Sequence, residues 1–554
     1  MRRWALLLGL AAALPAWAAQ PVHARHAMVV TVEPHATDVG VAVLQSGGNA
    51  VDAAVAVGFT LAVTHPSAGN IGGGGFLLVR FADGRSTFID FRERAPEAAT
   101  PTMYLDASGK PTQDSEIGYR AAGVPGTVRG FEYASKKYGR KPWAELVEPA
   151  LELAEKGYPV SYDSARSLRD HAGLLGRFPE SKRIFLRDGK PYEAGETLVQ
   201  PALARTLRRI RDQGARDFYE GETARLLAAD VQRHGGLITA ADLKDYTAVE
   251  RQPLKGGYRG YDILTAPPPS SGGIGILQML GVLEGSGYEK SGAGSAAELH
   301  FLAETMRRFF ADRAALLGDA DFVKVPLSGL LDKAYIKRLR DSIDPERATP
   351  SSAIHEDIGL TAESSQTTHY SIVDAEGNAA AVTYTLNGGY GDGVTVPGLG
   401  FLLNNEMDDF AAKPGEANLY GLVQSKANGI EPRKRPLSSM TPTIVTRDGK
   451  LFLVLGTPGG PTIINSVLQV VLDVVDFGMN VQDAVNFPRI HHQWLPDQLV
   501  IERGVSPDTI ALLKARGHRI RMVNGIGEVA AIEVRDGWLD GAPDPRSEAS
   551  ARGY

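Results

Sequence analysis

The sequence predicts a mixed fold of the α/β class, more closely α+β, in which helices pack against antiparallel sheet. Residues 38–66 place alanine, valine and leucine at near-helical spacing on both sides of Gly47-Gly48-Asn49, which indicates two helices. Residues from about 140 to 350 are rich in helix-forming side chains. From Thr367 onward the pattern changes to short alternating strands and tight turns. With 554 residues, 43% of them hydrophobic, the chain can build several domain-sized cores.

The first 18 residues have the pattern of a signal peptide. Met1-Arg2-Arg3 supplies a basic start, a short apolar run follows, and Ala16-Trp17-Ala18 is a small-x-small cleavage pattern. The apolar run is shorter than the ~20 residues of a comfortable membrane span, and Pro15 interrupts it. We therefore expect a mature protein that starts near Ala19 and lies in the periplasm, with release to the medium as the alternative.

Composition narrows the function classes. The net charge is -6 with acids and bases interspersed, so no basic surface for nucleic acid or an anionic membrane is expected, and the expected partner is a small molecule. The chain has no cysteine, which excludes disulfides, thiol nucleophiles and zinc–thiolate sites. We expect no cofactor.

Two glycine-rich segments suit the walls of a cavity. Asn70–Phe76 runs directly into a strand, but it lacks the Gly-Lys-Ser/Thr and the helix of a phosphate loop, which favours close backbone packing. Pro267–Gly273 is rigid at its start and flexible at its end.

The strands after Thr367 form a predicted hairpin. Thr367 to Val373 alternates, residues 374–378 form a turn, and Ala379 to Asn387 resumes the alternation. Because Val373 and Ala379 flank the turn, an antiparallel register brings Thr367 opposite Thr385. Two hydroxyls, with Asn387 just beyond them, should therefore lie at one end of the hairpin.

Common hydrolase signatures are missing. The chain has no Gly-x-Ser-x-Gly elbow and no His-Glu-x-x-His helix. His491-His492 lacks a third ligand at metal spacing, and Gly525-Ile526-Gly527 is a weak nucleotide signal. An N-terminal threonine offers another route, since its own α-amine, with a reference pKa near ~8, can accept the hydroxyl proton. This chemistry requires a cut before Thr367, and the local spacing alone is equally that of an ordinary strand start.

A family resemblance supplies that cut. The segment Thr367–Asp374 strongly resembles the start of the small subunit of γ-glutamyltranspeptidases, also called glutathione hydrolases. Further stretches resemble the family in the same order and together cover essentially the whole mature chain: Asp90–Glu93 with Ala95-Pro96, Pro267–Gly273, Leu403–Phe410, Arg435–Pro442 and Pro458–Gly460.

The resemblance implies the fold and the processing. Members of this family are N-terminal nucleophile hydrolases with a four-layer αββα sandwich, made as a precursor that cuts itself. Here it implies scission between Gln366 and Thr367, which gives a large subunit 19–366 and an interleaved small, catalytic subunit 367–554. The Thr367 hydroxyl would perform both the self-cleavage and the turnover.

The resemblance also implies the site residues. Thr367 attacks the γ-carbonyl of a γ-glutamyl amide such as glutathione and passes the glutamyl group to water, an amino acid or a dipeptide. Thr385 positions the nucleophile, and the N–H groups of Gly459 and Gly460 form the oxyanion hole. The glutamyl head is bound by a set of charged and polar side chains, with Arg92, Ser438 and Ser439 on its carboxylate and Asn387, Glu406 and Asp409 on its ammonium.

A lid completes the implied site. Lys413–Leu422 resembles the lid loop of many bacterial members, in which Tyr420 closes over the glutamyl pocket. Residues 388–392 and Pro461-Thr462 depart from many relatives, which leaves acceptor preference open.

Three alternatives remain. A cephalosporin or glutaryl acylase of the same fold cleaves a side chain without the α-ammonium, so the paired acids Glu406 and Asp409 count against it. A polyglutamate-attaching enzyme of the cell envelope should need an open groove, which the lid disfavours. A periplasmic binding protein would keep the pocket but stay a single polypeptide.

Overall fold

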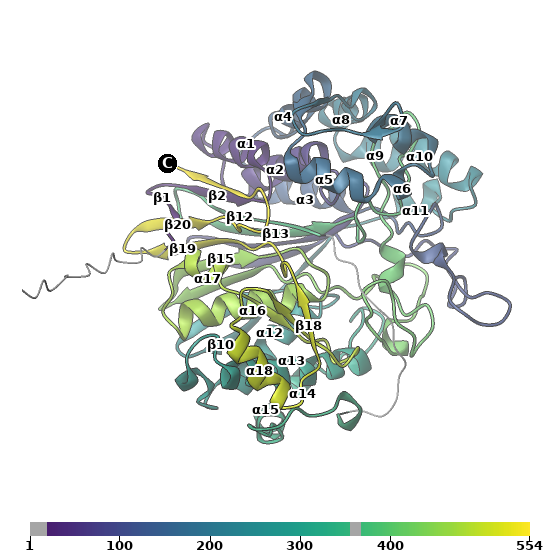
Figure 1. Cartoon of the computed structure of the whole chain (residues 1–554). Coiled ribbons are helices and arrows are strands. Elements are labelled where there is room, and N and C mark those ends of the chain that lie inside the picture. The colour runs from purple at the N-terminus through teal and green to yellow at the C-terminus, as the bar shows by residue number, and fades with distance from the viewer. Residues whose placement is uncertain (1–18, 355–366) are drawn as a thin grey trace, which may run out of the picture.

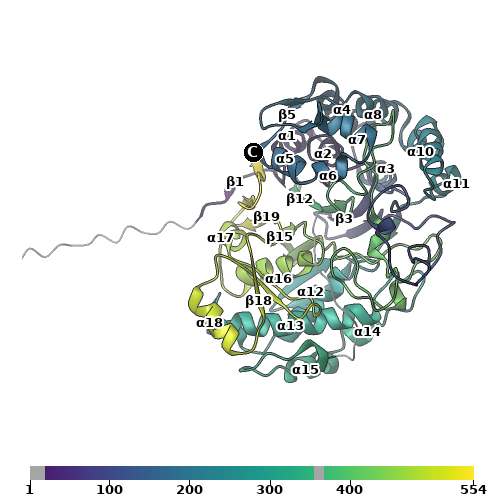
Figure 2. The ribbon, with the colours of Figure 1, turned by 45° about the vertical axis from the view of Figure 1, so that its right-hand side comes forward.

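The computed structural model describes residues 19–354 and 367–554. Two seven-stranded antiparallel sheets lie face to face, and helices cover the outer face of each sheet (Figures 1 and 2). This is the αββα sandwich that the resemblance implies. The predicted signal peptide 1–18 and Gln366 lie outside the described residues.

The first sheet carries the predicted hairpin. Its strands in spatial order are β21 (Ser550–Gly553), β2 (Met28–Thr31), β12 (Thr368–Val373), β13 (Ala379–Thr385), β3 (Gly74–Arg80), β4 (Ser86–Asp90) and β9 (Val249–Arg251). The register of the hairpin is the one expected, with Val373 opposite Ala379 and Thr368 opposite Tyr384. Strands from both sides of residue 367 are interleaved in this sheet, with β2 between β21 and β12 and with β13 beside β3, so neither part of the chain forms it alone.

The second sheet corrects one expectation. Its order is β1 (Val22–Ala24), β20 (Trp538–Ala542), β19 (Ala530–Arg535), β15 (Lys450–Gly456), β14 (Thr443–Arg447), β11 (Tyr261–Thr265) and β10 (Leu254–Tyr258). Residues 249–265 belong to the stretch expected to be mainly helical, yet they form three strands. Arg259 and Gly260, both with positive φ, make the tight turn that joins β10 to β11.

Two groups of helices flank the sheets. Over the first sheet lie α1 (Pro34–Gln45), α2 (Ala50–Thr64), α3 (Thr127–Tyr138), α4 (Trp143–Lys156), α5 (Tyr162–Asp170), α6 (Ala172–Leu175), α7 (Pro179–Phe185), α8 (Pro201–Gln213), α9 (Ala215–Glu220), α10 (Glu222–Arg233) and α11 (Ala240–Lys244). Over the second lie α12 (Gly272–Leu283), α13 (Ala296–Leu316), α14 (Leu327–Leu330), α15 (Lys333–Asp341), α16 (Thr462–Val475), α17 (Val481–Asn486) and α18 (Pro507–Ala515). Short strands complete the described elements: β5 (Tyr158–Pro159), β6 (Leu186–Arg187), β7 (Lys190–Pro191), β8 (Thr197–Leu198), β16 (Ile490–His491), β17 (Leu499–Glu502) and β18 (Ile520–Val523).

The predicted pair of helices in residues 38–66 is confirmed as α1 and α2. Asn49 begins α2 with a capping box, because its side chain accepts from the N–H of Asp52 while the Asp52 carboxylate accepts from the N–H of Asn49. The helix is buried along its whole length. It lies between the first sheet and α4, where both of its faces can exclude water.

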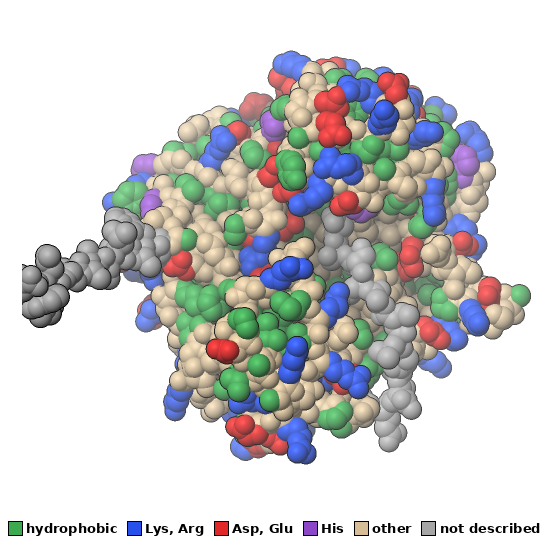
Figure 3. Space-filling view, in the orientation of Figure 1, with side chains coloured by type: hydrophobic (Ala, Val, Ile, Leu, Met, Phe, Trp, Pro, Cys, Tyr) green, Lys and Arg blue, Asp and Glu red, His purple; other side chains and the backbone are tan. Residues whose placement is uncertain are grey.

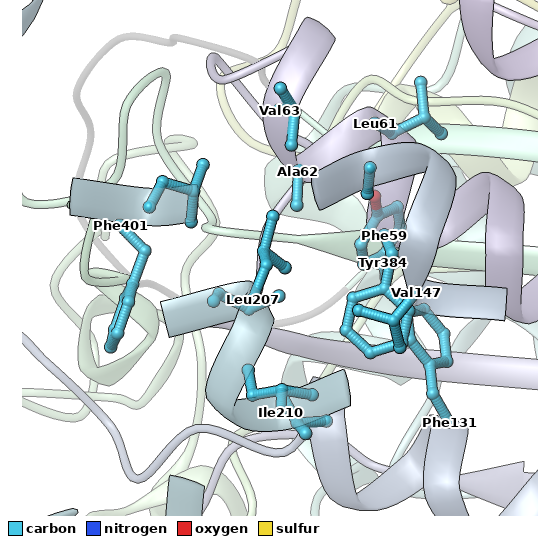
Figure 4. Close-up of a cluster of buried hydrophobic side chains, with 14 of the residues drawn as sticks. Phe59, Leu61, Ala62, Val63, Phe131, Val147, Leu207, Ile210, Tyr384 and Phe401 are labelled. Carbon is cyan, nitrogen blue, oxygen red and sulfur yellow. The ribbon is translucent and has the colours of Figure 1, made fainter. Parts of the chain in front are cut away.

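Apolar side chains fill three layers. Phe76, Ile444 and Ile532 are among those between the sheets. A second cluster joins the first sheet to its helices, where Phe59 and Phe131 meet edge to face near Tyr384 (Figure 4). A third joins the second sheet to α12, α13 and α16.

The hairpin is fixed to α2 by two buried tyrosines. Tyr370 of β12 donates to the carbonyl of Ala54 at 2.8 Å, and Tyr384 of β13 donates to that of Gly58 at 2.9 Å. Each bond satisfies a phenol that burial would otherwise strand without a partner. The end of the hairpin at Thr367 and Thr385 is thereby held rigidly.

The described surface agrees with the charge pattern of the sequence. Figure 3 shows Lys and Arg side chains interspersed with Asp and Glu on one face of the molecule. None of the helices in residues 19–354 and 367–554 is both long and apolar enough to cross a bilayer.

Candidate functional site

Thr367 lies at the end of the hairpin, immediately before β12. Its hydroxyl oxygen is 3.5 Å from that of Thr385, the last residue of β13. The N–H of Asn387 donates to the Thr385 hydroxyl at 2.8 Å, which helps to fix the position of that hydroxyl. The structure thus brings the predicted nucleophile and its predicted partner together.

His369 is the nearest histidine along the strand, but it is held away from proton transfer. Its ring nitrogens contact the hydroxyls of Thr383 at 2.7 Å and Ser371 at 3.1 Å. Burial lowers the pKa of His369 to about 3, so the ring is neutral and a weak base. A Cβ on Gly456 would lie 2.3 Å from the ring, so that position in the second sheet has room only for glycine.

Gly459 and Gly460 stand at the N-terminal end of α16. Both have positive φ, at 135° and 55°, a conformation that side chains with a Cβ rarely adopt. A Cβ on Gly460 would also lie 2.8 Å from the ring of Tyr420. No side chain caps α16, and the N–H groups of Thr462 and Ile463 in its first turn donate to the carbonyls of Gly459 and Gly460 at 3.1 and 3.2 Å.

Arg92 occupies the centre of the charged group. It follows β4, is 1% exposed, and donates to the carboxylates of both Glu406 and Asp409 in the short helix η4 (Glu406–Asp409). Its Nε also donates to the carbonyl of Pro436 at 3.2 Å. The predicted carboxylate-binding and ammonium-binding groups are therefore ion-paired with one another, a pairing that sequence did not predict.

Ser438 and Ser439 lie against the loop Pro267–Gly273. The carbonyl of Ser438 accepts from both the N–H and the hydroxyl of Ser271, each at 2.8 Å. The Ser438 hydroxyl accepts from the N–H of Met440 at 3.1 Å. The loop therefore holds Ser438 in place at the wall of the cavity.

Sequence reasoning missed Arg313 of α13. Its Nη2 donates to the Ser439 hydroxyl at 3.2 Å and its Nε to the Ser271 hydroxyl at 2.9 Å, while its Nη1 is buried with no hydrogen-bond partner among the described residues. Burial lowers the pKa of Arg313 to about 10, with Asp409 acting in the opposite direction. A charged run on an otherwise apolar helix was the available signal, since buried charges usually have a specific partner.

Tyr420 closes the cavity from the segment 413–423. Its hydroxyl donates to the carbonyl of Asn387 at 2.6 Å, and its own carbonyl accepts from Gln493 at 3.0 Å. Asn387 has φ of 73°, and its side chain donates to the carbonyl of Asn405 at 3.0 Å. The tyrosine is 3% exposed, so the segment lies closed over the site.

The predicted residues converge on two adjoining cavities. A narrow cavity is lined by ten of them: Arg92, Thr367, Thr385, Asn387, Glu406, Asp409, Tyr420, Ser438, Ser439 and Gly460. Gly459 instead lines a neighbouring, roomier cavity, which Thr367 also borders. Thr367 thus stands where the two spaces meet.

The described residues offer no metal site beside these cavities. Groups of three or more His, Asp or Glu side chains able to hold a metal do not occur in the described part of the chain. Both nitrogens of His491 are hydrogen-bonded, to Asn465 at 2.7 Å and to Gln493 at 2.9 Å. Burial lowers the pKa of His492 to about 4.

Comparison with known proteins identifies the family. The family model described as gamma-glutamyltranspeptidase matches residues 36–554. A glutathione hydrolase proenzyme from Escherichia coli (strain K12) is 51% identical over 530 residues, which cover 95% of this chain and 91% of that protein. The acylase ACY 1 proenzyme from Pseudomonas sp. (strain SE83) is 38% identical over 544 residues, or 96% and 94% of the two chains. The solved structure of a cephalosporin acylase from Bacillus halodurans superposes with a TM-score of 0.86 at 27% identity and covers 99% of each chain. The chain therefore belongs to the gamma-glutamyltranspeptidase family.

Proposed function

We propose that the protein is a γ-glutamyltranspeptidase and glutathione hydrolase. The observation that carries the proposal is the position of Thr367, which borders one cavity with a buried arginine and two acids and a second cavity on its other side. The first space suits the glutamyl head, and the second suits whatever is attached to the γ-amide nitrogen. The name and 51% identity of the Escherichia coli relative support glutathione as a donor.

The reaction begins with maturation. The Thr367 hydroxyl attacks the carbonyl of Gln366, and the resulting ester is hydrolysed. Fragments 19–366 and 367–554 remain together as a heterodimer, because strands from both pair with one another in the first sheet. The α-amine released on Thr367 then serves as the base, which suits a site whose neighbouring histidine is a weak base.

In turnover, Thr367 attacks the γ-carbonyl and forms a γ-glutamyl ester. Thr385 orients the nucleophile, and the backbone N–H groups of Gly459 and Gly460 stabilise the oxyanion as it forms. Water, or an amino acid or dipeptide amine, then attacks the ester and regenerates the Thr367 hydroxyl. No cofactor takes part.

Binding of the glutamyl head requires an exchange of partners. Its carboxylate joins Arg92, Ser438 and Ser439, and its ammonium joins Asn387, Glu406 and Asp409. Because Arg92 already pairs with both acids, the carboxylate of the head must displace the acids from Arg92 while its ammonium becomes their new partner. Tyr420 then limits the access of water.

The second candidate is a cephalosporin or glutaryl acylase, favoured by the superposition with the Bacillus halodurans enzyme. Glu406 and Asp409 oppose it, since a glutaryl group brings no ammonium to meet them. Cleavage of a γ-glutamyl anilide should exceed that of the matching glutaryl anilide. The reverse preference would replace our proposal with the acylase.

Processing provides the test against a mere binding protein. A mature preparation should contain two fragments whose intact masses place the cut between Gln366 and Thr367, and Thr367→Ala should remain one inactive polypeptide. Thr367→Ser, which keeps the hydroxyl, should still be cut. An intact and inactive wild-type chain would refute the enzyme. We place the protein in the periplasm on the strength of its signal-like first 18 residues, with the medium as the alternative.

A further inference from the structure

Glu93 is a buried acid beside the glutamyl-binding group that the proposed mechanism leaves unused. It follows Arg92 in the chain and is 0% exposed. A Cβ on Gly74 would lie 2.8 Å from Glu93 Oε2, and one on Gly123 would lie 3.1 Å from its Cβ. The carboxyl is therefore enclosed by backbone, and two glycines make the space for it.

The hydrogen-bond inventory around Glu93 is incomplete. Neither of its oxygens has a donor among the described residues, and Oε2 of Glu406 has none either. Arg92 donates its Nη1 to the other oxygen of Glu406 and lies 3.8 Å from Glu93, beyond hydrogen-bond length. A carboxylate can only accept, whereas a protonated carboxyl can also donate. One proton between the two acids would satisfy oxygens that otherwise stay without partners.

The balance of charges around Glu93 and Glu406 also requires one proton. The cations facing this cluster are Arg92 and, behind Ser439, Arg313; the acids are Glu93, Glu406 and Asp409. The phenols of Tyr246 and Tyr420 also face it, and burial keeps them neutral by raising the pKa of each. Asp408 interacts with Asp409, but its carboxylate accepts from the N–H of Leu419 and the hydroxyl of Ser115 on the lid side. With one shared proton, the two guanidiniums balance the acids. Without it, a buried site carries one uncompensated negative charge, which is costly.

We propose that Glu93 and Glu406 share one proton at neutral pH and that Glu93 is a positioning residue for the glutamyl head. The inference rests on the proposed function. When the donor binds, the proton stays on Glu93, whose O–H donates to Glu406, and the Glu406 carboxylate receives the α-ammonium. No bond other than hydrogen bonds changes. A site without net charge then receives a glutamyl head without net charge. A glutaryl group brings a single negative charge and would leave the site unbalanced.

The electrostatics of both acids support this arrangement. Burial raises the pKa of Glu93 to about 7, with Arg92 acting against the rise. Burial likewise raises the pKa of Glu406 well above its usual value, and the neighbouring Glu93 and Asp409 add to the effect while Arg92 opposes it. Two acids that interact this closely release their protons as a pair, so the proton belongs to the pair and not to one residue.

Infrared spectroscopy of the processed enzyme tests the shared proton without requiring activity. A protonated carboxyl has a C=O stretch separate from the carboxylate bands, so a wild-type-minus-variant difference spectrum at neutral pH isolates it from other buried acids. Glu93→Gln and Glu406→Gln should each remove the same single band, because the remaining acid ionises against the new amide donor. The double variant should remove nothing more. Glu346→Gln, which replaces a carboxyl whose side chain is 79% exposed, should leave the C=O stretch of protonated carboxyls unchanged.

Each other spectrum overturns the proposal. Two different bands, one lost in each single variant, would mean two protons. If neither variant lost a C=O band of a protonated carboxyl, both acids would be ionised. Since neither result depends on turnover, failure of the pair is distinguishable from an enzyme that does not cleave γ-glutamyl anilide at all.

Kinetics test the positioning role. In wild type, loss of the shared proton leaves Glu93 competing for Arg92, so the donor KM should rise from about pH 7 to about pH 9 with a smaller change in kcat. Glu93→Gln, which cannot ionise, should abolish that part of the rise. Glu93→Ala should raise the donor KM about tenfold at every pH, because Glu406 loses its donor. An equal rise in wild type and Glu93→Gln would assign the titration to another group and refute the role.

Discussion

The hydroxyl of Thr385 donates to the hydroxyl of Thr367 across 3.5 Å. The N–H of Asn387 also donates to the Thr385 hydroxyl, at 2.8 Å, so Thr385 is itself held in position. The nucleophile therefore has a partner that restricts its rotation, while its own proton remains available for transfer to its α-amine.

Replacing Thr385 should slow the chemical step. Thr385→Val keeps the shape but removes the hydroxyl, so Thr367 loses its partner and the buried Asn387 N–H loses its acceptor. We expect kcat for γ-glutamyl anilide to fall about tenfold or more, the effect of one or two hydrogen bonds. Self-cleavage, followed by gel electrophoresis over time, should slow as well because it uses the same hydroxyl.

Thr385→Ser serves as the matched control. It retains the hydroxyl and should keep most of the wild-type rate. A fully active valine variant would show that Thr367 is oriented by other contacts.

The relation between sequence and structure differs for each part of the site. The hairpin register was predictable because five turn residues connect two alternating strands, so a slip would move every side chain to the wrong face. The pairing of Arg92 with Glu406 and Asp409 was not predictable, since residues more than 300 positions apart meet only through the fold. The family resemblance named these residues but not their mutual contacts.

The local sequence pattern also did not predict the strands within 249–265 or the role of Arg313. Of the strands within 249–265, β9 and β10 are edge strands, and β9 and β11 pair with strands from distant segments, so local composition did not separate them from the helices around them. Arg313 carries no motif of its own. Its role depends on α13 passing behind Ser439, a purely tertiary fact.

Arg313 should control donor binding more than turnover. Arg313→Met keeps the apolar stem but removes the charged donor behind Ser439. We expect the donor KM to rise about tenfold to a hundredfold, as for a hydrogen bond to a charged group, with a smaller change in kcat because Ser439 holds the substrate in ground and transition states alike. Steady-state kinetics with γ-glutamyl anilide measure both constants.

The exposed Arg447 allows the same arginine-to-methionine change to be made away from the site, as a control. Arg447→Met should leave both constants unchanged. If Arg313→Met lowers kcat and leaves KM unaltered, Arg313 acts on the chemistry and not on the glutamyl head.

Asp408 should hold the lid segment closed. Its carboxylate accepts from the N–H of Leu419 at 2.8 Å and from the hydroxyl of Ser115 at 2.9 Å. Burial raises the pKa of Asp408 to about 7, although these two hydrogen bonds act against the rise. The charge-assisted bonds therefore weaken as pH falls through about 7, and the lid should open more often in acid.

Limited proteolysis follows that opening. Glutamyl endopeptidase should cut after Glu416 faster in Asp408→Asn than in wild type at about pH 8, and the two rates should converge toward about pH 6 as wild-type Asp408 protonates. Asp508→Asn, at an exposed position of α18, should cut like wild type. A constant ratio across this range would assign the lid contact to groups other than Asp408.

The Arg489–Asp544 pair should anchor the C-terminal strands against acid. Asp544 is 1% exposed and accepts from Arg489 at 2.7 Å, from the N–H of Val529 at 2.8 Å and from the N–H of Arg546 at 2.9 Å. Burial acts to raise the pKa of Asp544, but Arg489 and Arg546 outweigh it and hold the pKa below the usual value. Asp544→Asn should lower the free energy of unfolding by about 3 kcal/mol at neutral pH, the cost of breaking a buried pair.

The pH dependence of this difference follows from the depressed pKa. A carboxyl with a lower pKa in the folded state stabilises the protein above its unfolded pKa of about 3.9, and that stability is lost as pH falls toward the folded value. The urea midpoints of wild type and Asp544→Asn should therefore differ by a constant amount at pH values well above about 4 and approach each other below it. The exposed control Asp508→Asn should track wild type throughout. A gap between wild type and Asp544→Asn that persists undiminished into strong acid would mean that the variant is destabilised by its altered packing and not by the lost charge.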